Sequence, residues 1–133
     1  LSHKKWPYFN ELIEIIKKNY PNLELVIAPG PNELEDSKKI NAISITNKNQ
    51  SINLMELAGL IKKSSYVIAN DTGPAHMSAH LGKMGIVLFG YHTTAEKVSI
   101  ETDNFKAISV DKLENLKAEQ VYEQIKEKIK LIN

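Results

Sequence analysis

Apolar residues recur along the chain at two spacings, one typical of helices and one typical of strands. In residues 9–16 the apolar side chains lie three or four positions apart, and Pro7 suits the first turn of the helix that this spacing predicts. Near the C-terminus, Val121, Ile125 and Ile129 repeat every four positions and predict a closing amphipathic helix. Both ends of the chain are therefore expected to be helical.

Short apolar runs between the two end helices predict strands. The predicted strands are residues 23–28, 41–45, 65–70, 85–90 and 105–110. Further helices are predicted at residues 33–40, 53–63 and 74–81. The second of these begins with a capping box, because Asn53 is followed three positions later by Glu56. Strands that alternate with helices predict an α/β fold with a parallel sheet covered on both faces.

Composition narrows the class of protein. The length of 133 residues suits one domain, and 17 basic residues against 16 acidic ones give no reason to expect nucleic acid as a partner. The absence of cysteine excludes disulfides, thiolate nucleophiles and thiolate metal sites. Apolar runs such as 86–89 are too short to cross a bilayer, and the N-terminus has no signal-peptide core. We therefore expect a soluble, cytoplasmic domain, whose longest irregular stretch is 91–104, a loop with no assigned role.

The stretch NDTGPAH, residues 70–76, carries the main candidate chemistry. It lies between a predicted strand and a predicted helix, where parallel α/β sheets bind their ligands. Gly73 lets a ligand approach the backbone, and Pro74 presets the first helical turn. The amide groups of that turn favour an anion such as a phosphate or diphosphate, and Thr72 and His76 add further donors.

Asp71 has a different expected role, because a carboxylate repels a phosphate that touches it. It is better suited to accept hydrogen bonds from sugar hydroxyls beside the phosphate. Another interpretation stays open, in which Asp71 only caps the helix and His76 is a surface residue. His76 and His80 are four positions apart, as two metal ligands on one helix face are, but no third ligand accompanies them. We expect no metal site and no cofactor.

Charged residues elsewhere are weaker candidates. His3, Lys4 and Lys5 form a small basic group before the first helix, compatible either with phosphate binding or with a solvated chain end. Glu33 and Glu35 are suited to bind ribose hydroxyls, but they also suit a helix N-terminus, which is the simpler interpretation. The chain has neither a Walker loop nor a GxGxxG motif.

Taken together, several stretches in order resemble the heptosyltransferases, glycosyltransferase family 9. They are KKWPYFNELIEII, APGPNE, NLMELAGLIKKSSYVIANDTGPAHMSAHLGK and GIVLFG. The resemblance runs over nearly the whole chain, and the NDTGPAH block is its most specific part. The sequence departs from the family where FGYHT, residues 89–93, replaces the family's FG-P-T.

The resemblance implies a GT-B glycosyltransferase, of which residues 1–133 match the C-terminal, donor-binding domain. It implies an inverting transfer of heptose from an ADP-sugar to a lipopolysaccharide core or other glycan acceptor, without a metal. The acceptor site and the general base would belong to an N-terminal domain that the sequence does not contain. Association of the full-length protein with the inner membrane face is left open.

The resemblance also implies roles for individual residues around the donor. Lys4 matches the lysine at the diphosphate, Asp71 the acid near the sugar, and His76 the histidine that closes the site. The segment 72–74 matches the phosphate-binding helix start. On the adenosine side, Glu33 matches the ribose glutamate, with Glu35 as a competitor, and Ile52 falls at the adenine pocket.

The resemblance predicts an incomplete sheet at the N-terminal edge of the domain. In the family, the first strand of this domain lies before the lysine that Lys4 matches, in the central position beside residues 65–70. That strand was removed, lies on a separate chain or was not included, or else the sheet is rearranged or swapped. Two alternative functions stay open, a non-catalytic nucleotide-binding or phosphate-binding module and a glycosyltransferase that uses another nucleotide sugar.

Overall fold

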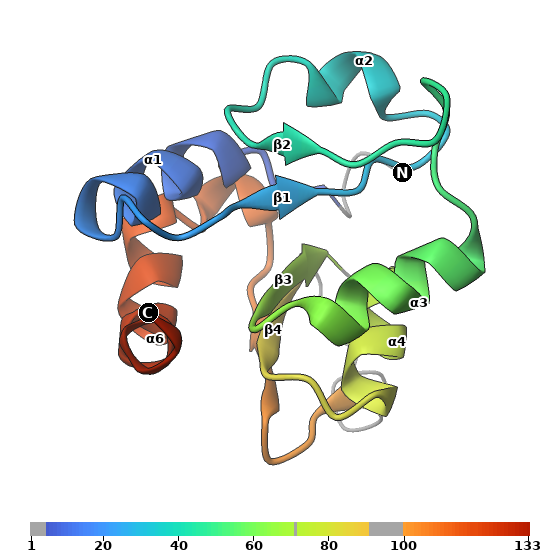
Figure 1. The fold of residues 1–133 in the computed structure, drawn as a ribbon. Helices are drawn as coiled ribbons and strands as arrows, with labels where there is room; N and C mark the ends of the chain where they lie inside the picture. Colours follow the sequence, from blue (N-terminus) through green and yellow to red (C-terminus); the bar gives the residue numbers. More distant parts are fainter. Residues whose placement is uncertain (1–4, 71, 91–99) are drawn as a thin grey trace.

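The computed structural model describes residues 5–70, 72–90 and 100–133, and Figure 1 shows how their helices and strands are arranged. The elements are, in chain order, α1 (Phe9–Asn19), β1 (Val26–Ile27), α2 (Leu34–Ser37), β2 (Ile43–Ser44), α3 (Leu54–Lys63), β3 (Val67–Asn70), α4 (Gly73–His80), β4 (Gly85–Phe89), β5 (Phe105–Ser109), the 3-10 helix η2 (Leu113–Asn115) and α6 (Ala118–Ile132).

The strands form two parallel sheets. The first contains β1 and β2, with Val26 opposite Ile43, and the second has the order β3-β4-β5. In the second sheet Val67 lies opposite Gly85, which in turn lies opposite Phe105. The predicted α/β class with parallel strands and helices is therefore confirmed.

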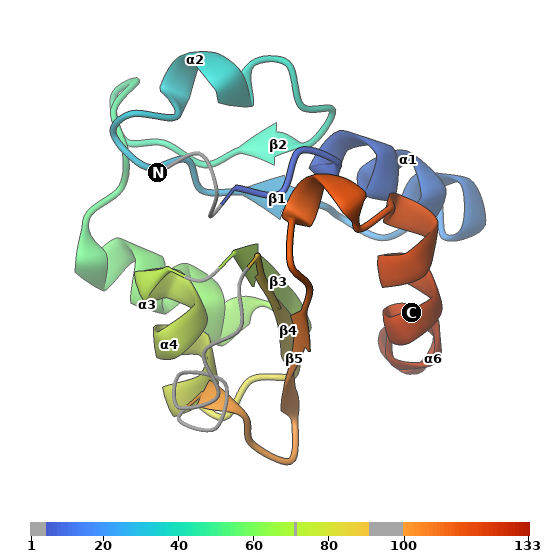
Figure 2. The same ribbon diagram turned by 180° about the vertical axis from the view of Figure 1, so that it is seen from behind.

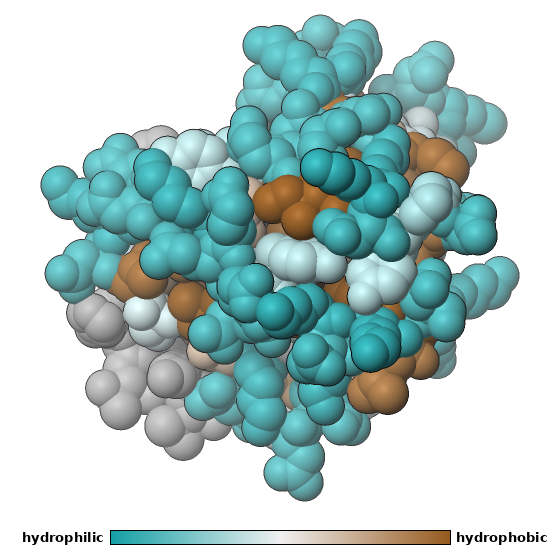
Figure 3. Space-filling model, turned by 90° about the vertical axis from the view of Figure 1, so that its left-hand side faces the viewer, coloured by the Kyte–Doolittle hydropathy of each residue, from teal (hydrophilic) through white to brown (hydrophobic). Residues whose placement is uncertain are grey.

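The core lies on both faces of β4. Its side chains alternate, so Ile86 and Leu88 pack with α1, η2 and α6, whereas Val87 and Phe89 pack with α4 and Phe105. Figures 1 and 2 show α1 and α6 on one side of this sheet and α3 and α4 on the other. Seen from the side of α1 and α6, the outer surface is mostly hydrophilic, with apolar residues in small separate patches (Figure 3).

Three predicted helices agree closely with the structure. The capping box of α3 forms in full, because Glu56 N–H donates to Asn53 Oδ1 at 2.8 Å and Asn53 N–H donates to Glu56 Oε1 at 2.9 Å. The helix α4 ends just before Gly82, whose φ of +71° is the left-handed conformation that glycine adopts without strain. The apolar repeat of α6 is buried along its whole length.

The predictions for residues 23–45 were too long. The strand expected at 23–28 contains only Val26–Ile27, and the strand expected at 41–45 contains only Ile43–Ser44. The alternating pattern at 41–45 predicted one buried face, but neither residue of β2 is buried, and Ile43 is 53% exposed. The physical reason is that, among the described residues, β2 has a neighbouring strand on one side only, and the short α2, which contacts it at Ser37 and Ser44, leaves both strand residues exposed.

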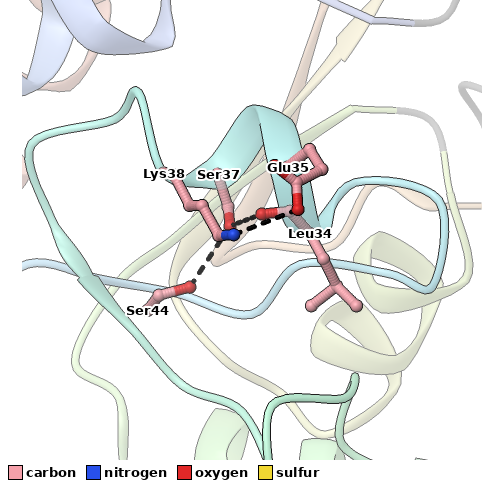
Figure 4. Close-up of polar contacts among 5 residues, drawn as sticks. All are labelled: Leu34, Glu35, Ser37, Lys38 and Ser44. Carbon is pink, nitrogen blue, oxygen red and sulfur yellow. Dashed lines mark hydrogen bonds and ion pairs between the residues drawn. The ribbon is translucent and has the colours of Figure 1, made fainter.

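The helix expected at 33–40 was also too long. Only Leu34–Ser37 is α-helical, and the chain continues with i→i+3 hydrogen bonds, such as Ile40 N–H to Ser37 C=O at 3.1 Å. Ser37 Oγ–H donates to Leu34 C=O at 2.7 Å and competes with the regular helical ladder (Figure 4). The side-chain bond and the tight turns together end the helix early.

Candidate functional site

A cavity of about 600 Å³ lies between the two sheets and opens at the carboxyl ends of β1 and β3. Its interior is mostly apolar, with walls from β1, α3, β3 and the chain around α1. The apolar lining residues include Phe9, Ile13, Val26, Ile27, Leu57, Leu60, Ile61, Tyr66, Val67 and Ile68. Burial raises the pKa of Tyr66, which lines this space, to about 12.

Polar residues from three separate segments line the mouth of this cavity. Lys5 precedes α1, Glu33 follows β1, Asn70 is the last residue of β3, and Thr72 is the N-cap of α4. In a parallel α/β structure the carboxyl ends of neighbouring strands meet at one edge, which is where ligands bind. The fold thus gathers these side chains at the place that the sequence predicted for the site.

Glu33 has one carboxylate oxygen in a local bond and one facing the basic side chain. Its Oε1 accepts a hydrogen bond from Gly30 N–H at 2.9 Å, which closes the turn after β1. Its Oε2 lies 3.9 Å from Lys5 Nζ, a separation typical of a weak, exposed ion pair. The second oxygen is therefore the one suited to accept a hydrogen bond from a ligand hydroxyl.

Glu35 is turned toward another partner. Its carboxylate lies 3.0 Å from Lys38 Nζ (Figure 4), and its side chain is 87% exposed. Because Glu33 lines the cavity and Glu35 does not, the geometry favours Glu33 as the ligand-binding glutamate of the two.

Asn70 connects the start of the chain to the NDTGPAH segment. Its Oδ1 accepts a hydrogen bond from Trp6 N–H at 2.9 Å, and Trp6 Nε1–H donates to Leu116 C=O at 2.7 Å. Trp6 is 3% exposed, so this residue holds the chain before α1 against the carboxyl end of β3. Sequence reasoning placed Asn70 in the NDTGPAH stretch and Lys5 in the basic group before the first helix, but it gave neither residue a role of its own.

The start of α4 offers fewer amide donors than a helix start usually does. The N–H groups of Ala75 and His76 both donate to Thr72 C=O, at 3.1 and 3.3 Å, and Pro74 has no N–H. Thr72 is the N-cap without a side-chain capping bond, and its hydroxyl donates to Asn70 C=O at 3.3 Å. Of the first three residues of the helix, Gly73 alone keeps an amide for an anion.

Gly73 is not crowded by the described part of the chain. Apart from its chain neighbours and the backbone of its own helix, no described atom lies within 4 Å of a Cβ built on Gly73, and both Thr72 and Gly73 are exposed. Packing in the described residues therefore gives no reason for glycine here, whereas close approach of a ligand to the backbone does.

The structure brings together some of the predicted site residues. Glu33, Thr72 and Pro74 line the same cavity, and Gly73 and His76 lie beside them, exposed, in the first turn of α4.

Other predicted positions lie apart from this group or outside the described part of the chain. Lys4 and Asp71 lie outside the described residues, as does the 91–99 part of the predicted loop. Ile52 is half-buried in the segment before α3 and is not among the described residues that line the cavity.

Two further properties bear on the class of protein. Among the described residues, no three histidine or carboxylate side chains gather as metal ligands do. In the same ranges, no helix combines the length and the apolar character that a membrane-spanning segment needs.

Comparison with known proteins gives one consistent result. Residues 2–130 match the sequence model described as glycosyltransferase family 9 (heptosyltransferase). A curated relative from Haemophilus influenzae (strain ATCC 51907 / DSM 11121 / KW20 / Rd), the lipopolysaccharide core heptosyltransferase OpsX, is 33% identical over 87 residues. That similarity covers 63% of this chain and 25% of OpsX.

Solved structures show the same fold. The E. coli heptosyltransferase WaaC with ADP is 22% identical with a TM-score of 0.81, and the match covers 96% of this chain and 41% of that one. WaaC with ADP-2-deoxy-2-fluoro heptose gives 21% identity and a TM-score of 0.79 over 95% and 39% of the two chains. E. coli ADP-heptose lps heptosyltransferase II is 15% identical with a TM-score of 0.75, and the match covers 96% of this chain and 42% of that one. The chain therefore spans well under half the length of these proteins.

Proposed function

The chain belongs to glycosyltransferase family 9, the heptosyltransferases, and on this premise we propose that it is the donor-binding domain of a glycosyltransferase. In this proposal the full-length protein transfers heptose from an ADP-sugar to a lipopolysaccharide core acceptor, with inversion at the anomeric carbon. The printed names of the relatives support the donor and acceptor classes: WaaC binds ADP and an ADP-heptose analogue, and OpsX is a lipopolysaccharide core heptosyltransferase.

The observation that carries the proposal is the convergence of Lys5, Glu33 and Thr72 at one cavity mouth beside the start of α4. These residues come from three segments far apart in sequence, and together they offer a cation, a carboxylate and a helix start. A nucleoside diphosphate needs that combination, because its phosphates are anionic and its ribose hydroxyls donate hydrogen bonds. In this arrangement Glu33 Oε2 accepts from the ribose.

The catalytic contribution of this domain is stabilisation of the leaving group. When the acceptor hydroxyl attacks the anomeric carbon, the bond to the diphosphate breaks and negative charge grows on the departing ADP. In this proposal the Gly73 amide and Lys4 hold that charge, and the Thr72 hydroxyl joins them by exchanging its bond to Asn70 C=O for one to the phosphate. Donors positioned where the charge develops lower the barrier. Asp71 accepts hydrogen bonds from the sugar. No metal is needed in this scheme, since protein donors neutralise the diphosphate.

Other parts of the scheme rest on the family alone. The general base and the acceptor site are assigned to a further domain of the full-length protein, and residues 1–133 to one donor-binding unit. A cytoplasmic location, with or without contact to the inner membrane face, is part of the same proposal. The 133-residue chain by itself is expected to bind donor weakly and to transfer no sugar.

The test is calorimetric titration of ADP, UDP, GDP and inorganic diphosphate into this chain and into two lysine variants. ADP is expected to bind most tightly, and Lys4→Ala to weaken diphosphate binding by about 1–2 kcal/mol, the value of a charge-assisted hydrogen bond. The matched control is Lys130→Ala, which removes an exposed lysine from the last turn of α6. Binding of diphosphate with no preference for a base would reduce the site to a general anion site.

A second substitution separates the proposed role of Asp71 from that of Lys4. Asp71→Asn should leave ADP binding unchanged and weaken binding of the ADP-sugar, because the carboxylate is assigned to the sugar hydroxyls. If Lys4→Ala and Asp71→Asn weakened ADP to the same extent, or if neither did, this division of roles would be wrong.

A further inference from the structure

Lys5 and Glu33 face each other at the mouth of the cavity without forming a direct hydrogen bond. Lys5 Nζ and Glu33 Oε2 are 3.9 Å apart, and both side chains are about half exposed. A direct hydrogen bond between an ammonium and a carboxylate is shorter, about 2.7–2.9 Å. One oxygen atom placed about 2.8 Å from each group reaches both, because two such lengths span more than 3.9 Å. We call these two side chains the open pair.

The chemistry of the open pair decides which ligand atom suits the space between its members. An ammonium only donates hydrogen bonds, and an ionised carboxylate only accepts them. A hydroxyl does both, because its oxygen accepts from Lys5 while its hydrogen is donated to Glu33. A phosphate oxygen is repelled by Glu33, and the amino group of a base does not accept from Lys5. Among the polar groups of a nucleotide, the open pair therefore suits a sugar hydroxyl.

Glu33 is held in its position by the turn that carries it. Glu33 N–H donates to Gly30 C=O at 3.0 Å, and Gly30 N–H donates back to Glu33 Oε1 at 2.9 Å. A Cβ atom on residue 30 would lie 3.0 Å from the same Oε1, closer than such contacts normally are. Glycine at this position therefore leaves room for the carboxylate, whose Oε2 faces Lys5.

Lys5 is held from the other side of the cavity. The next residue, Trp6, is 3% exposed, and its backbone N–H donates to Asn70 Oδ1 at 2.9 Å, at the end of β3. The indole N–H of Trp6 donates to Leu116 C=O at 2.7 Å. These two bonds fix the backbone beside Lys5 and limit how far its ammonium moves from Glu33. Both members of the open pair are thus positioned before a ligand binds, which lowers the ordering cost of binding.

We propose that Lys5 and Glu33 hold one ribose hydroxyl of the nucleotide between them, and that Lys5 makes the site selective for ribonucleotides over deoxyribonucleotides. The hydroxyl donates to Glu33 Oε2 and accepts from Lys5 Nζ. A deoxynucleotide displaces water from both charged groups and offers no hydrogen bond in return, so it binds less tightly. Sugars activated by a deoxynucleotide are therefore disfavoured as donors. This inference rests on the proposed nucleotide function, in which Lys4 is the lysine assigned to the diphosphate.

The test compares ADP with 2′-deoxy-ADP and 3′-deoxy-ADP by calorimetric titration into the 133-residue chain and its Lys5→Met variant. Methionine keeps most of the length of lysine and removes the charge. In the wild type, loss of the bridging hydroxyl should weaken binding by about tenfold, as expected for a hydrogen bond to charged groups. In Lys5→Met the same difference should fall below about threefold. The analogue with the larger loss in the wild type identifies the bridging hydroxyl.

Inorganic diphosphate separates this role from that of a phosphate-binding lysine. Its affinity should be equal for the wild type and Lys5→Met, because the open pair contacts only the ribose. The matched control is Lys38→Met, which removes the lysine of another exposed pair. Lys38 Nζ and Glu35 Oε1 are 3.0 Å apart, so no atom fits between them, and neither residue is among the described residues that line the cavity. The control should keep the ADP affinity and the preference for ADP.

A second variant moves the carboxylate without removing a charge. Gly30→Ala places a Cβ atom against Glu33 Oε1, so the carboxylate has to shift and its spacing from Lys5 changes. The preference for ADP over the sensitive deoxy analogue should fall, while diphosphate binding should stay the same. A purely structural role of Lys5 or Gly30 would instead change the binding of all these ligands alike.

The outcomes distinguish failure of this inference from failure of the proposed function. If ADP binds but the wild type shows no preference over either deoxy analogue, or Lys5→Met keeps the full preference, the open pair does not hold the hydroxyl. If Lys5→Met weakens diphosphate as much as ADP, Lys5 is a phosphate ligand and the inference is wrong. If the wild type binds no nucleoside diphosphate, the proposed function fails and this inference falls with it.

Discussion

The strands β4 and β3 belong to one sheet but differ in their surroundings. Every residue of β4 is buried, with Val87 and Leu88 fully inaccessible, whereas all four residues of β3 are only half-buried. The difference arises because β4 has a strand on each side, and β3 has β4 on one side and the cavity on the other. The half of the molecule around β4 therefore carries most of the stability.

The candidate site lies in the other half. Glu33 follows β1, Asn70 ends β3 and Thr72 comes just after it, so each functional segment lies at the carboxyl end of a strand that lines the cavity. Residues that bind ligands often lie in the less stable parts of a fold. Here the consequence is specific: changes near β4 should alter stability, and changes at the mouth should alter binding.

The largest expected contrast is between two isoleucines. Ile125→Ala removes a fully buried side chain of α6 and should lower the free energy of unfolding by about 2–5 kcal/mol. Ile43→Ala in β2, where the side chain is 53% exposed, should change it by less than about 0.5 kcal/mol. Urea unfolding measures both, and similar losses would contradict the assignment of the stable core to β4 and its neighbours.

The next contrast is between two glycines. A Cβ on Gly85 would collide with the Val67 carbonyl oxygen and lie 2.6 Å from Phe105 Cε1, so Gly85→Ala should cost about 1–3 kcal/mol of stability. Gly59 lies within α3, and outside its own helix backbone and chain neighbours no described atom lies within 4 Å of its added Cβ. Gly59→Ala should instead stabilise the protein by about 0.5–1 kcal/mol, the helix propensity difference. Thermal or urea unfolding of the two variants should give opposite signs.

A smaller effect is expected at the connection between Trp6 and Asn70. Asn70→Ala leaves the half-buried Trp6 N–H without its acceptor and should cost about 1 kcal/mol. Asn19→Ala is the control, since it removes an exposed side-chain bond to Ile15 C=O within one helix. If Asn70→Ala were as mild as this control, the segment before α1 would not be held at β3 by that bond.

The last expected effect is confined to high pH and is absent at neutral pH. Burial raises the pKa of Tyr66 from the usual 10 to about 12, so the folded state holds the phenol proton more tightly than the unfolded state. The contribution is fully present below pH 10 and is lost as the pH rises from 10 toward 12. The urea midpoint of the wild type should fall more steeply over this window than that of Tyr66→Phe. Parallel curves would show that Tyr66 is not buried beside the cavity.

The sequence by itself determined the elements whose signals are local. The capping box at Asn53 and Glu56, the four-residue repeat of α6 and the stop at Gly82 depend on neighbours in sequence, and the structure shows all three. The order of alternating strands and helices also sufficed to predict the parallel α/β class. The resemblance that placed the chain in glycosyltransferase family 9 was read from the same local blocks.

Only the tertiary structure decided the rest, because those features depend on partners distant in the chain. Glu33 and Glu35 look equivalent in sequence, and the ion pair of Glu35 with Lys38 separates them. The bond between Trp6 and Asn70 joins residues 64 positions apart, so no local pattern reveals it. The short length of β2 and the cavity beside β3 likewise depend on which strands pair with each other in the folded chain. The composition of the chain does not determine that pairing.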